Sequence, residues 1–387
     1  MSKFELIATA TFGLEAVVKR EIESLGYTII KSEDAKISYE GDETAIVRSN
    51  LWLRSADRVL LKMGEFTALS FEALFEQTKA LPWEEWIPED GKFTVNGSSV
   101  KSTLYSVPDC QAIVKKAIVE RLKETYHCDW FRETGAEYTV KVAILKDSAT
   151  LTIDTSGVGL HKRGYRIKDV TAPIKETLAA AMVSLSYWKA GRLLVDPFCG
   201  SGTIVIEAAM LAKNIAPGLN RKFASERWSR IPANLWKTAR KEAFGAINQT
   251  ADIKIVASDI SRKAIEAARE NAEEAGVADC ISFSVLPFNE LTAEEKYGIV
   301  ICNPPYGERI GERADLDQIY KDAKRFFSLN PTWSLYFLTS DKEFEKAFSN
   351  KPADKRRKLY NGRIETTYYQ YYGEKPPREE KPPRVDI

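Results

Sequence analysis

The sequence predicts an α/β protein whose second half folds around a mostly parallel β-sheet, with an α+β region before it. Two observations carry this prediction. In the second half, short apolar runs such as 253–259 and 298–302 alternate with amphipathic segments, as expected of parallel strands buried on both faces. A glycine-rich turn at 200–202 follows another such run, at the place where open α/β sheets bind ligands.

The first half mixes strands and helices without a cofactor turn. Apolar residues recur at helical spacing over 14–25, and Gly26 is a suitable C-cap. Ser70 can cap a helix that Pro82 ends. The predicted helices are 14–25, 70–80 and 108–126, and the predicted strands are 4–8, 45–47, 58–63, 92–95, 138–145 and 150–154.

The second half is more regular. Asn361-Gly362 between two strand-like runs predicts a hairpin, which adds an antiparallel edge to the sheet. Residues 214–248, with Trp228 and Trp236, interrupt the alternation and predict a helical insertion. The predicted helices are 174–188, 203–211, 262–275 and 316–327, and the predicted strands are 192–197, 253–259, 281–285, 298–302 and 334–339.

The composition excludes several classes of protein. The 387 residues are 44% hydrophobic and 29% charged, with a net charge of +1, so any surface for nucleic acid must be local. The five cysteines are far apart and there are two histidines, which supports neither a disulfide framework nor a metal site. The N-terminus lacks the apolar stretch of a signal peptide and no run is long enough to span a membrane, so we expect a cytoplasmic protein.

The turn D-P-F-C-G-S-G-T, residues 196–203, is typical of a nucleoside-cofactor site. Gly200 and Gly202 let the backbone turn tightly and approach a ligand without a Cβ atom in the way. Asp259 ends the following strand, where a carboxylate can accept hydrogen bonds from ribose hydroxyls. A P-loop would need Lys where Thr203 stands, and the spacing lacks the third glycine of G-x-G-x-x-G, so NAD is disfavoured. The alternative is a plain strand–turn–helix with chance glycines.

The tetrapeptide Asn303-Pro304-Pro305-Tyr306 ends another predicted strand. An exocyclic amine is a poor nucleophile, and acceptors on its two N–H bonds, Asn303 Oδ1 and the Pro304 carbonyl, can orient it toward a sulfonium methyl group. The prolines keep these acceptors rigid, and Tyr306 can stack on a flipped base. With the glycine turn, this predicts S-adenosylmethionine-dependent methylation of an exocyclic or amide nitrogen. Covalent catalysis by Cys302 is disfavoured, because its side chain is expected in the core.

These motifs resemble one family. D-P-F-C-G-S-G-T, A-S-D-I and N-P-P-Y-G-E-R look like the cofactor, ribose and catalytic motifs of class I amino-methyltransferases acting on RNA, and 171–182 resembles their N-terminal cofactor segment. The G-E-R extension at 307–309 and the N-terminal region resemble the THUMP-domain methyltransferases. Among these, the large-subunit ribosomal RNA guanine-N2 methyltransferase L family is the most similar.

The resemblance implies a class I (Rossmann-like) methyltransferase domain with a mostly parallel seven-stranded sheet, preceded by an α+β ferredoxin-like/THUMP RNA-binding region. Some members carry a second, fused methyltransferase domain, and here we expect one activity. The implied domains are a ferredoxin-like segment (1–65), a THUMP RNA-binding module (66–160), a methyltransferase domain (161–373) and a flexible tail (374–387).

The resemblance also implies S-adenosyl-L-methionine as cofactor, no metal, and a set of site residues. Asp259 would bind the ribose and Asn289 the adenine. The implied catalytic residues are Asn303, Pro304, Pro305 and Tyr306. The implied cofactor residues are Thr177, Asp196, Pro197, Phe198, Cys199, Gly200, Ser201, Gly202, Thr203, Asp259, Ile260 and Asn289.

Basic residues between the two halves are candidates for RNA contact. The segment 156–168 is rich in glycine and basic residues, and predicts an exposed connector that either contacts RNA phosphates or is simply solvated. A second basic run, 355–358, offers the same two possibilities beside the predicted hairpin. The predicted RNA-contact residues are Lys162, Arg163, Tyr165, Arg166, Lys168 and Arg309.

The leading hypothesis is methylation of the exocyclic N2 of a guanine in large-subunit (23S) ribosomal RNA, free or in a pre-ribosomal particle. The alternatives are N2-guanine methylation of transfer RNA, N6-adenine methylation of nucleic acid, methylation of a protein glutamine, and a non-catalytic ribosome-assembly factor. The first half disfavours DNA and protein substrates. Asp196, Asp259 and Asn303 together disfavour a pure binding role.

Overall fold

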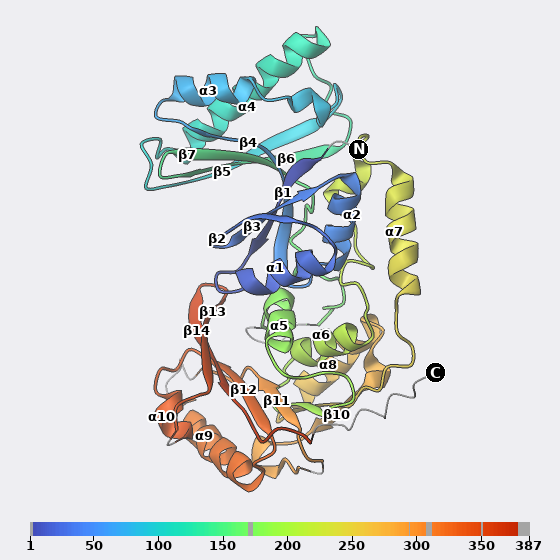
Figure 1. Ribbon diagram of the computed structural model, residues 1–387, viewed down its shortest axis with the longest axis vertical. Helices are drawn as coiled ribbons and strands as arrows, with labels where there is room; N and C mark the ends of the chain where they lie inside the picture. The colour runs from blue at the N-terminus through green and yellow to red at the C-terminus, as the bar shows by residue number, and fades with distance from the viewer. Residues whose placement is uncertain (1–2, 169–172, 294, 307–311, 350, 378–387) are drawn as a thin grey trace, which may run out of the picture. The chain divides into compact units, whose positions relative to one another are not determined.

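The chain of the computed structural model divides into two compact units that do not follow the order of the sequence (Figure 1). Unit 1 comprises Met1–Gly164 and Ile215–Ile247, and unit 2 comprises Tyr165–Asn214 and Asn248–Ile387. Most of the predicted tail, 374–387, lies outside the described residues, and the predicted domain boundaries stay predictions. The structure describes residues 3–168, 173–293, 295–306, 312–349 and 351–377, without the side chains of 312 and 313.

Unit 1 contains a seven-stranded sheet in the order β2-β3-β1-β4-β7-β6-β5. Its described neighbours run antiparallel except β5 and β6, which are parallel. The predicted α+β character of the first half is therefore confirmed (Figure 1). The elements are β1 Phe4–Ala10, α1 Glu15–Ser24, β2 Ile29–Glu33, β3 Lys36–Gly41, α2 Glu43–Trp52, β4 Ala56–Thr67, α3 Phe71–Lys79, β5 Lys92–Val100, α4 Val107–Tyr126, β6 Glu137–Leu145 and β7 Ser148–Asp154.

One predicted strand of unit 1 is wrong. Residues 45–47 lie in helix α2, because the Asp42 carboxylate accepts a hydrogen bond from the Ala45 N–H at 2.9 Å and caps its first turn. Ile46 and Leu51 are then buried on the helix. A short apolar run cannot distinguish the two kinds of element by itself, and the cap decides between them.

Residues 215–247 interrupt the second half of the sequence and pack on unit 1. They contain helix α7 (Ala233–Gly245), which confirms the predicted helical insertion. Trp228 is 1% exposed, and its ring stacks on Tyr138 of β6 with centroids 4.8 Å apart. The indole N–H of Trp228 donates to the Glu137 carbonyl at 3.2 Å. The sheet of unit 1 thus holds the insertion.

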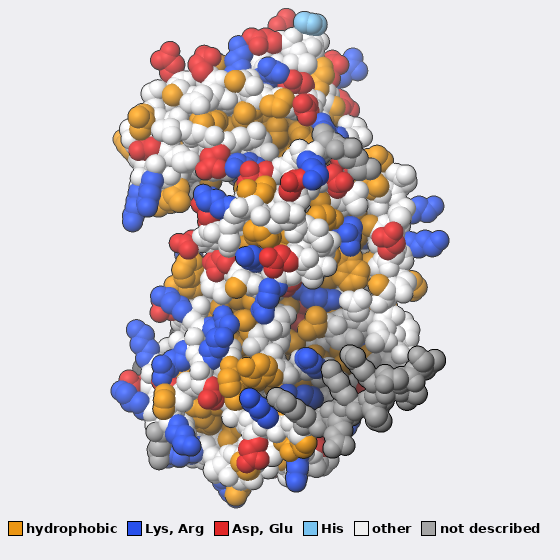
Figure 2. Space-filling view, in the orientation of Figure 1, with side chains coloured by type: hydrophobic (Ala, Val, Ile, Leu, Met, Phe, Trp, Pro, Cys, Tyr) orange, Lys and Arg blue, Asp and Glu red, His pale blue; other side chains and the backbone are white. Residues whose placement is uncertain are grey.

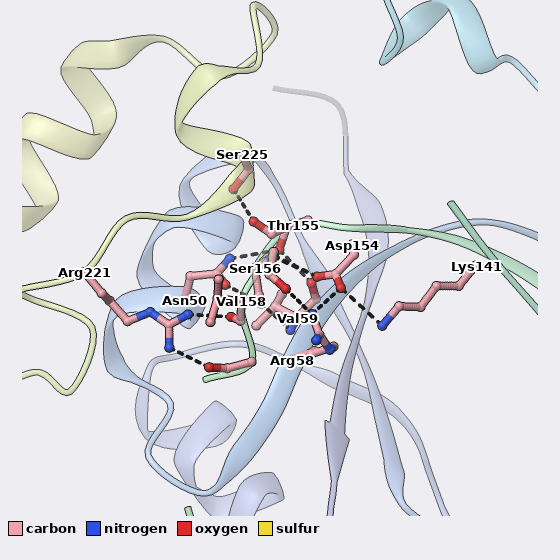
Figure 3. A network of polar contacts seen from close by, with 12 residues as sticks. Asn50, Arg58, Val59, Lys141, Asp154, Thr155, Ser156, Val158, Arg221 and Ser225 are labelled. Atoms are coloured by element: carbon pink, nitrogen blue, oxygen red, sulfur yellow. Dashed lines mark hydrogen bonds and ion pairs between the residues drawn. The ribbon is translucent and has the colours of Figure 1, made fainter. Parts of the chain in front are cut away.

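Polar contacts also join the insertion to the end of β7 (Figure 3). The Ser225 hydroxyl donates to the Thr155 carbonyl at 2.8 Å, and the Arg221 guanidinium donates to the Val158 carbonyl. The neighbouring Asp154 is 2% exposed and is ion-paired with cationic side chains of β4 and β6. Breaking such a buried network is costly, because each group would be left without a partner.

Unit 2 contains a seven-stranded sheet in the order β10-β9-β8-β11-β12-β14-β13. The first five strands are parallel and β14 is antiparallel to both neighbours, which confirms the predicted parallel sheet with an antiparallel edge. Helices α5, α6 and α8 cover one face, and α9 and α10 cover the other (Figure 1). The elements are α5 Glu176–Ser184, β8 Leu194–Asp196, α6 Thr203–Ala212, β9 Ile255–Asp259, α8 Arg262–Glu274, β10 Ile281–Val285, β11 Ile299–Cys302, α9 Glu312–Leu329, β12 Ser334–Thr339, α10 Phe344–Phe348, β13 Lys355–Asn361 and β14 Ile364–Tyr371.

An aromatic core lies between this sheet and helices α9 and α10. Phe337 of β12 stacks on Phe344 of α10 with ring centroids 4.2 Å apart. Val300 and Cys302 of β11 belong to the same buried cluster. Cys302 is 1% exposed, and burial raises the pKa of its thiol, so the structure gives it no nucleophilic character. This packing fixes the end of β11.

Candidate active site

The glycine turn after β8 is held against the neighbouring strand and helix. Gly200 and Gly202 have φ angles of 52° and 84°, which side chains disfavour. The Cys199 N–H donates to the Ser258 carbonyl of β9 at 3.0 Å. A Cβ atom on Gly202 would lie 3.0 Å from the Cβ of Ala268 in α8. Glycine at 202 is therefore required by backbone geometry and by the close approach of α8.

Two carboxylates end neighbouring parallel strands beside this turn. Asp196 is 1% exposed and accepts from the Phe198 N–H at 3.1 Å. Asp259 accepts from the Gly200 N–H at 3.1 Å and from the Ser261 N–H at 2.9 Å. Burial, opposed by the Phe198 hydrogen bond and reinforced by the Asp259 charge, raises the pKa of Asp196 to about 8. A cationic ligand beside this carboxyl would favour its ionised form.

The residues predicted at the adenine lie on strand-end loops. Ile260 follows Asp259 and is 75% exposed. Asn289 is exposed in the 3₁₀ turn Phe288–Glu290. The ring centroid of Phe288 lies 5.4 Å from that of Phe198 in the glycine turn. The loop that carries Asn289 therefore packs on the turn.

Arg166 connects the starts of α5 and α6. Its guanidinium donates to Thr203 Oγ1 at 3.0 Å and to the Ile174 carbonyl at 2.8 Å. Its Nε also lies 3.2 Å from a carboxylate oxygen of Glu176, which is 3% exposed. Thr177, the predicted cofactor residue next to Glu176, is fully buried. The Arg166 side chain thus supports the end of the cofactor turn.

Asn271 of α8 was not predicted as a site residue, yet it joins two segments at the turn. Its Oδ1 accepts from the N–H groups of Ile167 and Lys168, each at 3.0 Å. Its Nδ2 donates to the carbonyls of Lys168 and Ser201, also at 3.0 Å. The side chain is fully buried. The signal in the sequence was the spacing of Asn271, which lies three residues after the buried Ala268 and therefore on the same face of α8.

Asn303 and Tyr306 come together directly after β11. The Tyr306 hydroxyl donates to Asn303 Oδ1 at 2.6 Å, and it accepts from the Nδ2 of Asn361 at 3.3 Å. Pro304 is buried and Pro305 is exposed. Asn361 lies at the turn of the β13–β14 hairpin and was predicted only as a turn residue. The contact between this turn and the tetrapeptide could not be read from local sequence patterns.

The predicted exposed connector is partly wrong. Arg163 is 3% exposed, with its guanidinium donating to the carbonyls of Leu160 and Arg54, and Tyr165 is 5% exposed with its hydroxyl donating to Glu207 at 3.0 Å. These two side chains are structural because the backbone carbonyls and a buried carboxylate need their donors. Arg166 is half-buried, as described above, while Lys162 and Lys168 are exposed. Arg309 lies outside the described residues.

The second basic run lies on β13. Figure 2 shows Lys and Arg side chains on the part of unit 2 that carries the β13–β14 hairpin. Arg356 is ion-paired with Glu345 at 2.8 Å, and Lys358 with Glu365 at 2.6 Å. The positive charge of this run is therefore partly neutralised. Its strand is the edge of the sheet, where charged side chains discourage pairing with another chain.

Among the described residues, no group of three or more His, Cys, Asp or Glu side chains is arranged to hold a metal ion. None of the described helices combines the length and apolar character needed to cross a membrane.

Comparison with known proteins identifies the family. A family model described as the RMKL-like methyltransferase domain matches residues 163–370, more than half of the chain. This chain belongs to the RMKL-like methyltransferase family. Before that domain, a model of the RlmL ferredoxin-like domain matches residues 5–60 of the RMKL-like chain, and a THUMP domain model matches residues 68–154.

Two relatives differ in how much of their length the RMKL-like chain covers. The Bacillus subtilis protein YpsC, named as a candidate RNA methyltransferase, is 52% identical over 98% of this chain and 99% of its own. The ribosomal RNA large subunit methyltransferase K/L of Psychromonas ingrahamii is 35% identical over 93% of this chain and 49% of its own. The chain therefore spans about half the length of this K/L relative.

Solved structures share the whole architecture. A Listeria monocytogenes protein, named as a predicted N6-adenine-specific DNA methylase, is 52% identical, with a TM-score of 0.92 over 97% of both chains. The methyltransferase SMU.472, solved with S-adenosyl-L-homocysteine, is 41% identical, with a TM-score of 0.92 over 97% of this chain and all of its own. S-adenosyl-L-methionine is the cofactor of the family. The tight turn at Gly200, with φ of 52°, and the carboxyl groups that end β8 and β9 fit this cationic nucleoside.

Proposed function

We propose that this RMKL-like methyltransferase transfers a methyl group from S-adenosyl-L-methionine to the exocyclic N2 of a guanine in large-subunit ribosomal RNA. The observation that supports this proposal most directly is the placement of three predicted site residues. Asp196 and Asp259 end β8 and β9, and Asn303 follows β11, on three adjacent parallel strands. The strand order reverses between β8 and β11, and at such a switch point the cofactor and the reacting group can meet.

The glycine turn and the two carboxyl groups have separate roles in holding the cofactor. When bound, the cofactor supplies an electrophilic methyl group on a cationic sulfur. Asp259 accepts hydrogen bonds from ribose hydroxyls with the lone pairs that its two backbone donors leave unused. Asp196 faces the positive charge, Gly200 lets the backbone approach the cofactor closely, and Gly202 shapes the turn by letting α8 pack against it. The exposed Ile260 offers an apolar face to the adenine, with Asn289 on the adjoining loop.

The tetrapeptide Asn303–Tyr306 holds and orients the target base during methyl transfer. Asn303 Oδ1 and the Pro304 carbonyl accept the two N–H bonds of the target amine, which orients its nitrogen lone pair toward the methyl group. Tyr306 stacks on the flipped base, and Pro305 keeps the turn rigid. The proton that the methylated amine loses passes to solvent. Each of these groups acts by position and charge, without a covalent intermediate on the protein.

RNA as substrate is supported by the THUMP match and by the names of the relatives. The name of the K/L relative points to the large ribosomal subunit, either free RNA or a pre-ribosomal particle, and hence to the cytoplasm. Lys162 and Lys168 are the exposed members of the predicted RNA cluster, and Arg309 remains a predicted member. Because this basic cluster is small, recognition of the RNA would depend largely on its shape and on its single-stranded bases.

The nucleoside product tests the proposal. Purified protein with labelled cofactor is incubated separately with unmodified large-subunit ribosomal RNA, bulk transfer RNA and DNA, and the nucleosides are analysed by mass spectrometry. N2-methylguanosine in ribosomal RNA is expected. The name of the Listeria structure makes N6-methyladenine the specific rival. N6-methyladenine in either nucleic acid, or label in transfer RNA alone, would replace the proposed target. No label in any of them, nor in pre-ribosomal particles, would favour a non-catalytic assembly role.

Two substitutions test the division of roles. Asp259→Ala should weaken cofactor binding at least tenfold, because it removes the ribose acceptor and leaves the N–H groups of Gly200 and Ser261 without their partner (about 1–3 kcal/mol). Asn303→Ala should lower turnover about a hundredfold while cofactor affinity stays near that of the wild type. Calorimetric titration with S-adenosyl-L-homocysteine and single-turnover assays measure the two effects. Equal cofactor affinity in Asp259→Ala and wild type would contradict the ribose assignment.

A further inference from the structure

We propose that Asn361 is a positioning residue for methyl transfer, which acts through the Tyr306 hydroxyl to fix the amide orientation of Asn303. This inference rests on the proposed function, in which Asn303 Oδ1 accepts the target amine. The three side chains form a chain of hydrogen bonds. Asn361 Nδ2 donates to the Tyr306 hydroxyl at 3.3 Å, and that hydroxyl donates to Asn303 Oδ1 at 2.6 Å.

The direction of these hydrogen bonds determines which atom of the Asn303 amide faces Tyr306. An amide Nδ2 can only donate, so the Tyr306 oxygen accepts from Asn361. With the Asn361 amide in this orientation, the single proton of the hydroxyl is directed to Asn303, and the atom that accepts it is Oδ1. A carbonyl oxygen has two lone pairs, so Asn303 keeps one for the target amine. If the amide of Asn303 were turned over, its Nδ2 would meet the N–H donors of the substrate and repel them.

The β13–β14 hairpin fixes the position of Asn361, where this series of hydrogen bonds begins. Asn361 pairs with Ile364 as the last pair of the β13–β14 ladder. Gly362 follows with φ of 64°, and it closes the tight turn. The ladder continues through Leu359 and Thr366, which are buried. The position of Asn361 is therefore set by the sheet of unit 2 and not by the segment that carries Asn303.

A double-mutant cycle in the full-length protein tests the relay. Asn361→Ala should lower kcat about tenfold, with little change in KM for RNA or in affinity for S-adenosyl-L-homocysteine, because one orienting hydrogen bond is lost. Asn361→Asp should lower kcat at least as much, since a carboxylate accepts the phenol proton and draws it from Asn303. Tyr306→Phe should have a similar or larger effect. In the Tyr306→Phe background, Asn361→Ala should cause no further loss.

Controls separate positioning from folding and from direct RNA contact. Glu365→Gln changes an exposed β14 residue of the same hairpin and should leave kcat unchanged. All variants should melt within a few degrees of the wild type, as expected for changes of this size. An undiminished effect of Asn361→Ala in the Tyr306→Phe background, or an effect confined to KM, would overturn the relay and indicate direct contact with RNA.

A measurement without turnover separates failure of the relay from failure of the proposed function. With ¹⁵N-labelled asparagine, the side-chain amide signal of Asn303 is identified by its loss in Asn303→Ala. The relay predicts that this signal shifts in Tyr306→Phe and in Asn361→Ala, and stays in place in Glu365→Gln. An unmoved signal in Asn361→Ala would overturn the inference even if methylation is confirmed. A shifted signal in a protein that methylates no RNA would support the relay while the proposed function fails.

Discussion

Asn271 and Ser201 are joined by a hydrogen bond of 3.0 Å from the side-chain amide to the backbone carbonyl, although 70 residues separate them in sequence. The same side chain holds the backbone of Ile167 and Lys168. One buried amide of α8 therefore fixes both the glycine turn and the segment that leads into α5. The shape of the cofactor turn depends on a helix that does not carry the motif.

We expect Asn271→Ala to lower both stability and cofactor affinity. The substitution leaves two N–H groups and two carbonyls without their buried partner, at about 1–3 kcal/mol for each group that water cannot reach. Denaturant unfolding and calorimetric titration with S-adenosyl-L-homocysteine measure the two effects. Asn271→Asp keeps the acceptor for Ile167 and Lys168 but places a carboxylate oxygen against the carbonyls of Lys168 and Ser201, so it should lose at least as much stability. Unchanged cofactor affinity in Asn271→Ala would show that the turn holds its shape unaided.

Gly202→Ala should destabilise unit 2 and weaken cofactor binding. Its φ of 84° costs a side chain about 1–2 kcal/mol, and the new Cβ would lie 3.0 Å from that of Ala268. Gly276→Ala is the control, since Gly276 also has positive φ, 69°, but an added Cβ there meets nothing within 4 Å. The control should lose stability from backbone strain and keep its cofactor affinity. Equal loss of affinity in both variants would refute a local role for Gly202.

Without cofactor, Asp196 should make the protein less stable as pH rises toward 8. Its folded pKa of about 8 lies above the ordinary value of 3.8, so the folded state binds more protons than the unfolded state between these values. That contribution is present at low pH and is lost as pH rises through 8, at up to about 1.4 kcal/mol per pH unit. Asp196→Asn should remove this slope.

Urea unfolding of wild type and Asp196→Asn at several pH values between 5 and 8 measures the difference. Burial also raises the pKa of the Glu21 carboxyl, and that contribution is common to both proteins. The comparison therefore isolates Asp196. Parallel stability curves for the two proteins would mean that Asp196 is ionised in the folded protein.

Arg163 and Lys162 should respond in opposite ways to truncation. Arg163→Ala removes buried donors from the carbonyls of Leu160 and Arg54, and should lower the melting temperature by several degrees. Lys162→Ala changes an exposed side chain, and should leave stability intact while weakening RNA binding more at low salt than at high salt. Filter binding at two salt concentrations and thermal melts separate the two. A melting temperature of Arg163→Ala equal to the wild type would contradict the structural role.

Much of unit 2 could be predicted from sequence because its apolar runs and amphipathic segments alternate regularly. Apolar runs gave β9, β10, β11 and β12, and helical spacing gave α6 and α8. The motif residues Asp196, Asp259 and Asn303 were found because each directly follows or ends such a run. Register and order along the sheet needed the structure, since they depend on pairing between distant strands.

The misses at the candidate site share a physical cause, which is contact between residues that are far apart in sequence. Arg163 and Tyr165 look like an exposed basic connector in sequence, and only their partners show that they are buried. Asn271 and Asn361 look like an ordinary helix residue and a turn residue, and their bonds to Ser201 and Tyr306 span large separations. The α2 error had a different cause. Asp42 is an N-cap that can be seen in the sequence, but the run of three apolar residues after it was given more weight and taken as a strand.

The insertion at 215–247 affects the order in which this protein can mature during synthesis. Trp228 packs on Tyr138 and Ser225 bonds to Thr155, so unit 1 lacks part of its core until residues far beyond β7 have been made. The first strand of unit 2, β8, is synthesised before the segment that completes unit 1. An N-terminal fragment cut at residue 164 would expose the Tyr138 ring and the Thr155 carbonyl. Synthesis of unit 2 therefore begins, at Tyr165, before the last segment of unit 1, Ile215–Ile247, has been made.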